Sequence, residues 1–188
     1  MSLQIPSTST CAFLFIDLQP VFTDRFNGTA FQTQTECALA AARAAVTPDK
    51  IVHLRANYVG SKMQPFSRVL DPSKAVPSDI KATTWAEELP GELVMMKTTI
   101  NGFHETDLEQ YLTGLGVDTI ILSGLMTCCC VHETAIGGLV RGFAPVLVED
   151  ACVDKNEEKQ AATIMLFKDY LYQTCLLKEV TERFAAGP

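Results

Sequence analysis

The stretch that decides the fold is Gly124-Leu125-Met126-Thr127-Cys128-Cys129-Cys130-Val131, which follows the apolar run Ile120–Leu122. The run is typical of a buried strand, and the residues after it form a helical pattern that ends at Gly142. A strand that turns sharply into a helix points the first helical residues at the carboxyl edge of a sheet. Free backbone N–H groups and the positive end of the helix dipole favour a thiolate there. A cysteine at this position is therefore a candidate nucleophile.

Short apolar runs alternate with amphipathic helical segments along the rest of the chain. The runs that predict strands are Cys11–Asp17, Ile51–Arg55, Glu92–Met96, Ile120–Leu122 and Pro145–Val148. Because strands separated by helices need crossover connections, the pattern indicates a mainly parallel sheet. We therefore predict an α/β fold. The exception is the proline-rich segment Tyr58–Leu89, which we interpret as an excursion over the sheet edge.

Helix starts are predicted from residues that cap the first turn. The pairs are Thr33 with Glu36, Thr106 with Glu109, and Asp154 with Glu157. The last pair begins a long helix, whose apolar stripe comprises Ile164, Phe167, Leu171 and Cys175. Within the segment 130–141, the pair Gly137-Gly138 is unusual for a helix and predicts close packing against the sheet or a partner subunit.

Length and composition bound the functional classes. A chain of 188 residues with 47% hydrophobic and 20% charged residues is most simply one globular domain spanning 1–188. Its net charge of −7, without a basic stripe, argues against nucleic acid as a partner. The apolar runs are too short to span a membrane, and residues 1–10 show no secretory signal. The seven cysteines show no CxxC spacing, so we expect reduced thiols and a cytoplasmic protein.

Three polar side chains fall at the predicted carboxyl edge, where open parallel sheets bind their ligands. Asp17 ends the first strand, Lys97 ends the strand Glu92–Met96, and Cys130 lies just past Ile120–Leu122. A carboxylate, an ammonium and a thiol are chemically sufficient for acyl transfer, because the first moves protons, the second favours the thiolate and the third attacks.

With these residues in these positions, the sequence resembles the isochorismatase-like cysteine hydrolase superfamily, which includes nicotinamidases and N-carbamoylsarcosine amidases. The matching pieces are Asp17-Leu18-Gln19 with Phe22, Lys97 with Asn101-Gly102-Phe103 and Thr106, Gly124-x-x-Thr127-x-x-Cys130-Val131 with Thr134, Gly142, and Glu149-Asp150-Ala151. The resemblance implies a three-layer α-β-α fold with a mainly parallel six-stranded sheet. It also implies a homo-oligomer that acts on a small molecule.

Carried over by position, the resemblance implies a catalytic triad of Asp17, Lys97 and Cys130. It places a cis peptide bond between Leu125 and Met126, and it makes the N–H groups of Met126 and Cys130 an oxyanion hole. We expect the substrate pocket to include Gln19, Phe22, Asn57, Tyr58 and Trp85. The reaction implied is hydrolysis of a C–N bond in a small amide or carbamoyl compound through a thioester.

No catalytic metal and no cofactor are expected. A metal-dependent nicotinamidase should show an Asp-x-His pair soon after the second strand, where this chain has Arg55-Ala56-Asn57-Tyr58. The start of a zinc-protease signature at His132-Glu133 lacks its second histidine, because position 136 is Ile136.

Three alternatives remain open at the level of sequence. The first is an isochorismatase-type vinyl-ether hydrolase, against which the presence of Cys130 argues. The second is a non-catalytic binding protein of the same fold. The third is a redox sensor built on Cys128–Cys130, although Cys128 and Cys129 are interpreted as packing or loop residues.

Overall fold

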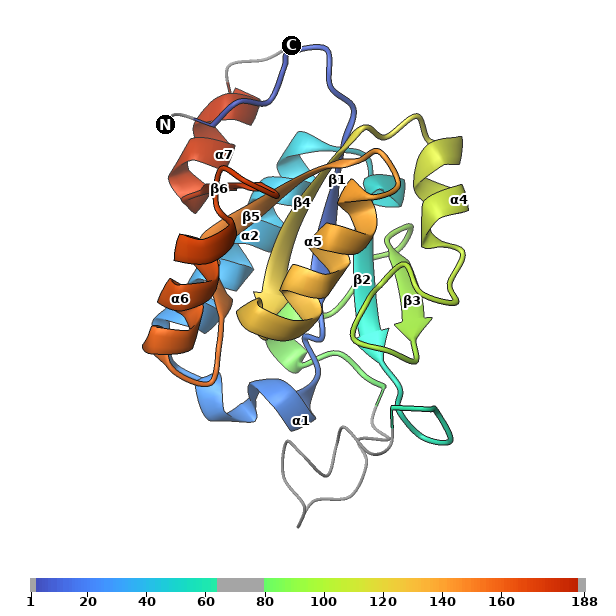
Figure 1. Ribbon diagram of the computed structural model, residues 1–188, viewed down its shortest axis with the longest axis vertical. Coiled ribbons are helices and arrows are strands. Elements are labelled where there is room, and N and C mark those ends of the chain that lie inside the picture. Colours follow the sequence, from blue (N-terminus) through green and yellow to red (C-terminus); the bar gives the residue numbers. More distant parts are fainter. Residues whose placement is uncertain (1–2, 64–79, 186–188) are drawn as a thin grey trace.

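The computed structural model describes residues 3–63 and 80–185, and these fold around one parallel sheet (Figure 1). The strands lie in the order β3-β2-β1-β4-β5-β6, and every neighbouring pair is parallel. Their bounds are β1 Cys11–Ile16, β2 Ile51–Ala56, β3 Leu93–Lys97, β4 Thr119–Leu125, β5 Ala144–Val153 and β6 Gln173–Cys175. The predicted α/β fold with a six-stranded sheet is confirmed.

Helices connect most of the neighbouring strands in the chain, and the last helix follows β6. They are α1 Pro20–Thr23, α2 Ala30–Ala45, α4 Leu108–Gly114, α5 His132–Leu139, α6 Glu157–Phe167 and α7 Leu177–Ala185. The short 3-10 turns are η1 Asp24–Phe26, η2 Pro48–Lys50 and η3 Thr84–Ala86, and a π-helical turn, η4, spans Thr127–Val131.

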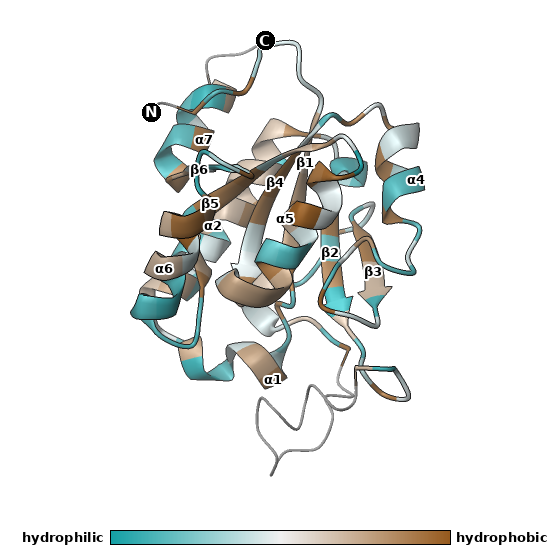
Figure 2. Cartoon of the chain, viewed as in Figure 1, coloured by the Kyte–Doolittle hydropathy of each residue, from teal (hydrophilic) through white to brown (hydrophobic). Residues whose placement is uncertain are grey.

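Each face of the sheet carries its own apolar core, which gives the three layers of the fold. In β1, Phe13 and Phe15 pack with α2 and α7 on one face, whereas Leu14 and Ile16 pack with α4 and α5 on the other. Because both faces are covered, β1 is apolar throughout, and every residue of β2 and β4 is buried. Figure 2 shows this as brown strands at the centre and teal residues on the outer helices.

The two helical glycines pack where no side chain fits, as predicted. A Cβ at Gly138 would lie 2.4 Å from Ile120 Cδ1 on β4, and one at Gly137 would lie 2.4 Å from the Asn101 side-chain oxygen. Both distances are far below van der Waals contact, so α5 approaches the sheet through its glycines.

The predicted helix starts differ in accuracy. Helix α2 begins at Ala30 instead of near Thr33, whereas α4 begins at Leu108, whose N–H donates to the predicted cap Thr106 Oγ1 at 3.4 Å. Helix α6 is capped by Asn156, which accepts a hydrogen bond from the Lys159 N–H at 2.9 Å. Asp154, the predicted cap, accepts hydrogen bonds from two other backbone N–H groups.

The predicted continuation of the last apolar stripe as one helix was wrong. Helix α6 ends at Phe167, and Asp169 has a left-handed φ of 61° that stops it. Cys175 belongs instead to β6, where it is the register partner of Val148 on β5. Hydrogen bonding along the sheet edge thus overrides the helical spacing of these residues.

The predicted excursion Tyr58–Leu89 is described only at its two ends, and 64–79 lie outside the described residues. After the gap the chain returns to the sheet where the Thr83 N–H donates to the Leu18 carbonyl oxygen at 2.9 Å. Across the described ranges, the helices are too short and too polar for any to cross a lipid bilayer.

Candidate active site

Three side chains from separate strand ends meet at the carboxyl edge of the sheet. Asp17 directly follows β1, Lys97 is the last residue of β3, and Cys130 lies in the η4 turn after β4. The Lys97 ammonium donates a hydrogen bond to Asp17 Oδ2 at 2.9 Å, and both side chains are buried. Since β2 separates β3 from β1, the lysine side chain crosses β2, where its register partner is the small residue Ala56.

Tyr58 connects the cysteine to this ion pair. Its hydroxyl lies 3.7 Å from Cys130 Sγ and accepts a hydrogen bond from Lys97 Nζ at 3.5 Å. The other carboxylate oxygen, Asp17 Oδ1, is buried and is not paired with Lys97, and the Cys130 thiol is the further acidic neighbour of this carboxylate. A buried acceptor without a donor is costly, so Oδ1 is available to a proton or an N–H group that enters the site.

Burial and mutual charge set the protonation of this cluster. Burial raises the pKa of Asp17 well above its ordinary value, and Cys130 adds to the rise while Lys97 opposes it. The pKa of the Cys130 thiol is also raised, first by its hydrogen bond with Cys129 and then by burial, against the lowering effect of Lys97. Burial alone would lower the pKa of Lys97, but the nearby Asp17 and Cys130 raise it overall.

One buried cation therefore faces two acids, and it favours only one negative charge between them. The raised pKa values place Cys130 as a thiol in the resting site. Burial and the Cys129 hydrogen bond raise the pKa of Cys130 more than the charge of Lys97 lowers it. Asp17 and Cys130 are therefore the two acids of the site between which a proton can move.

The backbone before Cys130 is shaped by a close approach of β4 to β1. Gly124 has a φ of 127°, and a Cβ there would lie 2.2 Å from the carbonyl oxygen of Ile16. The peptide bond between Leu125 and Met126, one residue further along the chain, is cis. It is the bond for which the family resemblance implied a cis conformation.

Asp154, at the carboxyl end of β5, fixes the η4 turn. Its Oδ2 accepts the Cys128 N–H at 2.7 Å, and its Oδ1 accepts the Lys155 N–H at 2.7 Å. The residue is 2% exposed, so these charge-assisted hydrogen bonds are shielded from water. The carboxylate holds the turn that presents Cys130.

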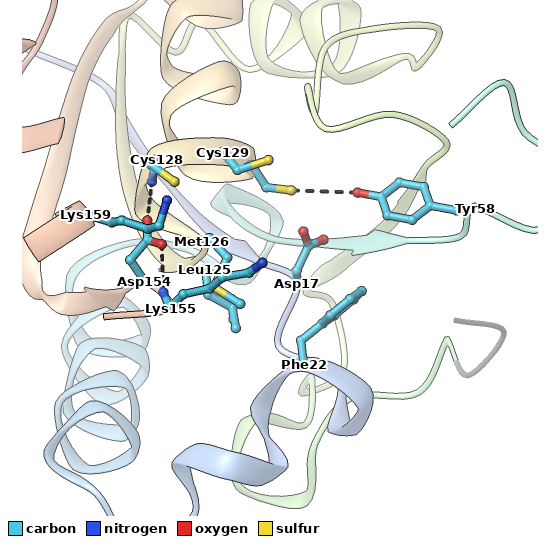
Figure 3. Close-up of a pocket in the computed structure, with 11 residues that line it drawn as sticks. Asp17, Phe22, Tyr58, Leu125, Met126, Cys128, Cys129, Asp154, Lys155 and Lys159 are labelled. Atoms are coloured by element: carbon cyan, nitrogen blue, oxygen red, sulfur yellow. Dashed lines mark hydrogen bonds between the residues drawn. The ribbon is translucent and has the colours of Figure 1, made fainter. Parts of the chain in front are cut away.

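A pocket of about 300 Å³ opens beside the sulfur atom (Figure 3). Its lining residues are Asp17, Phe22, Tyr58, Leu125, Met126, Cys128, Cys129, Cys130, Asp154, Lys155 and Lys159. The volume suits a small molecule. Lys97 supports the pocket from below its surface, since it is fully buried.

Of the residues expected in the pocket, Phe22 and Tyr58 line it, whereas Gln19, Asn57 and Trp85 are not part of its lining. The Gln19 side chain is buried and makes two hydrogen bonds to the backbone of Ala56, at 2.7 and 3.0 Å, which tie β1 to β2. Asn57 accepts a backbone N–H two residues further on. Trp85 donates its indole N–H to Asn27 Oδ1 at 2.9 Å.

Sequence reasoning missed Asp154, Lys155 and Lys159 as pocket residues. The strand that precedes them was predicted to end at Val148, but β5 extends to Val153. The polar pair Glu149-Asp150 interrupts the apolar run, so the prediction ended the strand too early. The residues Ala151–Val153, which continue the strand to the sheet edge, could have indicated the longer strand.

The described residues contain no group of three or more His, Cys, Asp or Glu side chains placed to hold a metal ion. His53, in the middle of β2, pairs with Glu92 at 2.8 Å.

The sequence and the fold both match known proteins. Residues 11–178 match the isochorismatase domain model. The chain belongs to the isochorismatase family. Among solved structures, an isochorismatase family protein from Desulfovibrio vulgaris has a TM-score of 0.80 at 22% identity, covering 95% of this chain and 100% of the other. That likeness shows the shared fold.

Curated relatives in the family include amide hydrolases. Nicotinamidase 3 of Arabidopsis thaliana is 37% identical over 76 residues, which are 40% of this chain and 38% of the relative. N-carbamoylsarcosine amidase of Arthrobacter is 29% identical over 90 residues, 45% of this chain and 33% of the relative. These matches therefore span about a third of the length of each relative. Amidases are thus among the relatives of this chain within the family.

Proposed function

We propose that the protein is a metal-independent cysteine hydrolase that cleaves a C–N bond of a small amide or carbamoyl compound through a thioester. The observation that carries the proposal is the buried contact of Asp17 with Lys97, next to a cysteine that lines a small pocket. The amidase relatives support the same bond class.

In the first step, Asp17 accepts the Cys130 proton as the sulfur attacks the carbonyl carbon of the substrate. The raised pKa of Asp17 suits it to this task, because a carboxylate with a higher pKa is a stronger base. Lys97 remains charged and offsets the negative charge as it moves from Asp17 to sulfur and then to the carbonyl oxygen. The N–H groups of Met126 and Cys130 are the proposed donors to that oxyanion.

In the second step, the tetrahedral intermediate collapses and the C–N bond breaks. The proton held by Asp17 passes to the leaving nitrogen, which departs as ammonia or an amine. Asp17, again a carboxylate, then takes a proton from water as the water oxygen attacks the thioester. The C–S bond breaks, the acid product leaves, and the proton returns to Cys130.

A panel of small amides, ureas and carbamoyl compounds, scored for ammonia release, tests this proposal. The wild-type protein should turn over at least one of them, and Cys130→Ala should lose that turnover by about a thousandfold or more. Cys37→Ala is the matched control, because Cys37 is an exposed thiol on α2. Undiminished turnover by Cys130→Ala would rule the mechanism out.

A chelator separates this proposal from a metal-dependent one. Turnover should be unchanged after dialysis against EDTA. Activity that is lost on dialysis and restored by added divalent metal would contradict the metal-independent mechanism.

A further inference from the structure

We infer that the Tyr58 hydroxyl donates a hydrogen bond to the Cys130 sulfur and stabilises the negative charge that develops there when Asp17 takes the thiol proton. The inference rests on the proposed hydrolase function and adds a residue that contacts the reacting atom. Tyr58 is 2% exposed, and its hydroxyl lies 3.7 Å from Cys130 Sγ. Figure 3 shows the tyrosine ring with its hydroxyl pointing at this sulfur atom.

The hydrogen bonds around Lys97 indicate which group donates. An ammonium group has donors only, so the tyrosine oxygen is the acceptor in the 3.5 Å hydrogen bond from Lys97 Nζ to the Tyr58 hydroxyl. The hydroxyl can then use its own O–H as a donor to the sulfur. The tyrosine thus links the buried cation to the nucleophile, and the charge of Lys97 polarises the O–H bond that points at Cys130.

The tyrosine keeps its own proton while the sulfur changes state. Burial raises the pKa of Tyr58 well above its ordinary value, and the neighbouring Cys130 and Asp17 raise it further. The Cys130 proton moves instead to Asp17, with which the thiol is hydrogen-bonded. Tyr58 therefore acts as a hydrogen-bond donor and not as a general acid or base.

Titratable side chains from several elements face the Cys130 sulfur. The hydrogen bond with Cys129 and burial raise the pKa of the thiol, whereas Lys97 and the hydrogen bond with Asp17 lower it. Tyr58 differs from all of these because it supplies an uncharged donor. A neutral donor that is already in place stabilises a developing anion without the cost of burying a second cation.

The tyrosine ring is held by contacts that do not use its hydroxyl. The Asn57 N–H donates to the Lys97 carbonyl oxygen at 2.9 Å, which extends the pairing of β2 with β3. The Tyr58 carbonyl oxygen accepts the Ser61 N–H at 3.2 Å and the Ser61 hydroxyl at 3.1 Å. The Lys97 ammonium also lies 5.6 Å from the centroid of the ring, a cation–π contact. Tyr58→Phe should therefore remove the hydroxyl and keep the ring in place.

The pH profile of Cys130 alkylation tests the inference without a substrate. Iodoacetamide reacts with the thiolate, and tandem mass spectrometry separates Cys130 from Cys128 and Cys129. We expect Tyr58→Phe to slow the alkylation of Cys130 about tenfold at neutral pH and to move the midpoint of the profile upward by about one pH unit, because the thiolate loses a hydrogen bond.

A stronger donor in the same place should act in the opposite sense. The four tyrosines can be replaced during biosynthesis by 3-fluorotyrosine, which has nearly the same volume and a more acidic hydroxyl. Alkylation of Cys130 should then be about twofold faster than in the natural protein. The gain should be absent from Tyr58→Phe prepared with the same amino acid, which assigns it to this one hydroxyl.

Tyr111→Phe is the matched control. The Tyr111 hydroxyl also donates a hydrogen bond, to the Asp49 carbonyl oxygen at 2.7 Å, but it does so beside the start of β2, at the other edge of the sheet. This variant should leave the alkylation of Cys130 unchanged. Equal rates in the wild type and Tyr58→Phe, a fluorinated protein that reacts no faster, or an equal loss in Tyr111→Phe would overturn the inference.

The two proposals fail separately because alkylation needs no substrate. A rate that depends on Tyr58, without ammonia release from any amide, would uphold the hydrogen bond and reject the hydrolase. Ammonia release that is lost in Cys130→Ala, with alkylation independent of Tyr58, would uphold the hydrolase and reject the inference. With a substrate from the panel, Tyr58→Phe should lower kcat about tenfold at pH 7 and change KM little.

Discussion

At the scale of single residues, the buried Lys97–Asp17 pair is the feature on which the site depends. Lys97 is 0% exposed and its ammonium lies 2.9 Å from the carboxylate. A buried ion pair adds little net stability over an apolar pair of the same shape, but either charge alone is costly. The pair therefore belongs to the chemistry of the site more than to the stability of the fold.

This gives a prediction for stability. Lys97→Met should lower the free energy of unfolding by about 3 kcal/mol, because Asp17 is left buried without its counter-charge. Adding Asp17→Asn to Lys97→Met should recover most of that loss. Urea unfolding of the wild type, both single variants and the double variant at pH 7 measures the coupling. Losses that simply add would contradict the interpretation.

At the scale of elements, the strand ends were predictable and the connections were less so. Apolar runs predicted β1, β3 and β4, and both faces of the central strands β1 and β4 are buried. Asp17, Lys97 and Cys130 followed from the ends of these three strands. The three-residue strand β6 has no such run, so its residues were assigned to a helix.

The pocket was harder to predict than the buried cluster. Gln19 was expected in the pocket, but its amide bonds to the backbone of β2, a partner that spacing does not reveal. Lys155 enters the pocket because β5 continues past two polar residues to Val153. Such contacts join residues that are far apart in the sequence, whereas a buried strand is visible in the sequence as a run of apolar residues.

The junction of β4 with β1 gives a second prediction. Gly124→Ala should destabilise the fold by more than about 3 kcal/mol, because the new Cβ would meet the Ile16 carbonyl oxygen at 2.2 Å. The matched control is Gly28→Ala, where φ is also positive but the space is open, and strain of about 1–2 kcal/mol is expected. Thermal denaturation compares the two variants, and equal losses would contradict the account.

The strand that carries Lys97 is anchored by Glu92, which joins three elements. Its carboxylate bonds to Arg43 on α2 at 2.7 Å, to His53 on β2 at 2.8 Å and to the Leu89 N–H at 2.9 Å. Burial tends to raise the pKa of Glu92, but the hydrogen bonds from Arg43 and Leu89 lower it to about 2, from an ordinary value of 4.5.

The depressed pKa predicts how stability changes with pH. The stabilising contribution of Glu92 is present above pH 4.5 and is lost as pH falls through about 2. Glu92→Gln should therefore cost about 2 kcal/mol at pH 7 and much less near pH 2. Denaturant unfolding at both pH values measures this, with Glu87→Gln as an exposed control. A cost independent of pH would show that the charge of Glu92 is not what stabilises the strand.

At the scale of the whole molecule, the end of α6 presents an apolar surface to solvent. Met165 is 77% exposed, Leu166 is 62% exposed and the nearby Tyr170 is 82% exposed. Clustered exposed apolar residues are typical of interaction sites. We propose that a second copy of the chain covers them.

Sedimentation velocity tests this proposal. The particle should be heavier than the 20.5 kDa chain, and Met165→Lys combined with Leu166→Lys should shift it toward the monomer without lowering its melting temperature. Leu89→Lys, at another exposed apolar residue, is the control. A monomer at every concentration would contradict the proposed self-association.

The central claim is that Cys130 becomes acylated during turnover, with Asp17 and Lys97 as its acid–base and charge partners. Mass mapping of protein quenched with acid during amide hydrolysis tests this most directly. We predict an added acyl group on the peptide that contains Cys130, absent from Cys130→Ala and from protein without substrate. Steady ammonia release with every thiol unmodified, or an acyl group on Cys128 or Cys129 alone, would contradict the account.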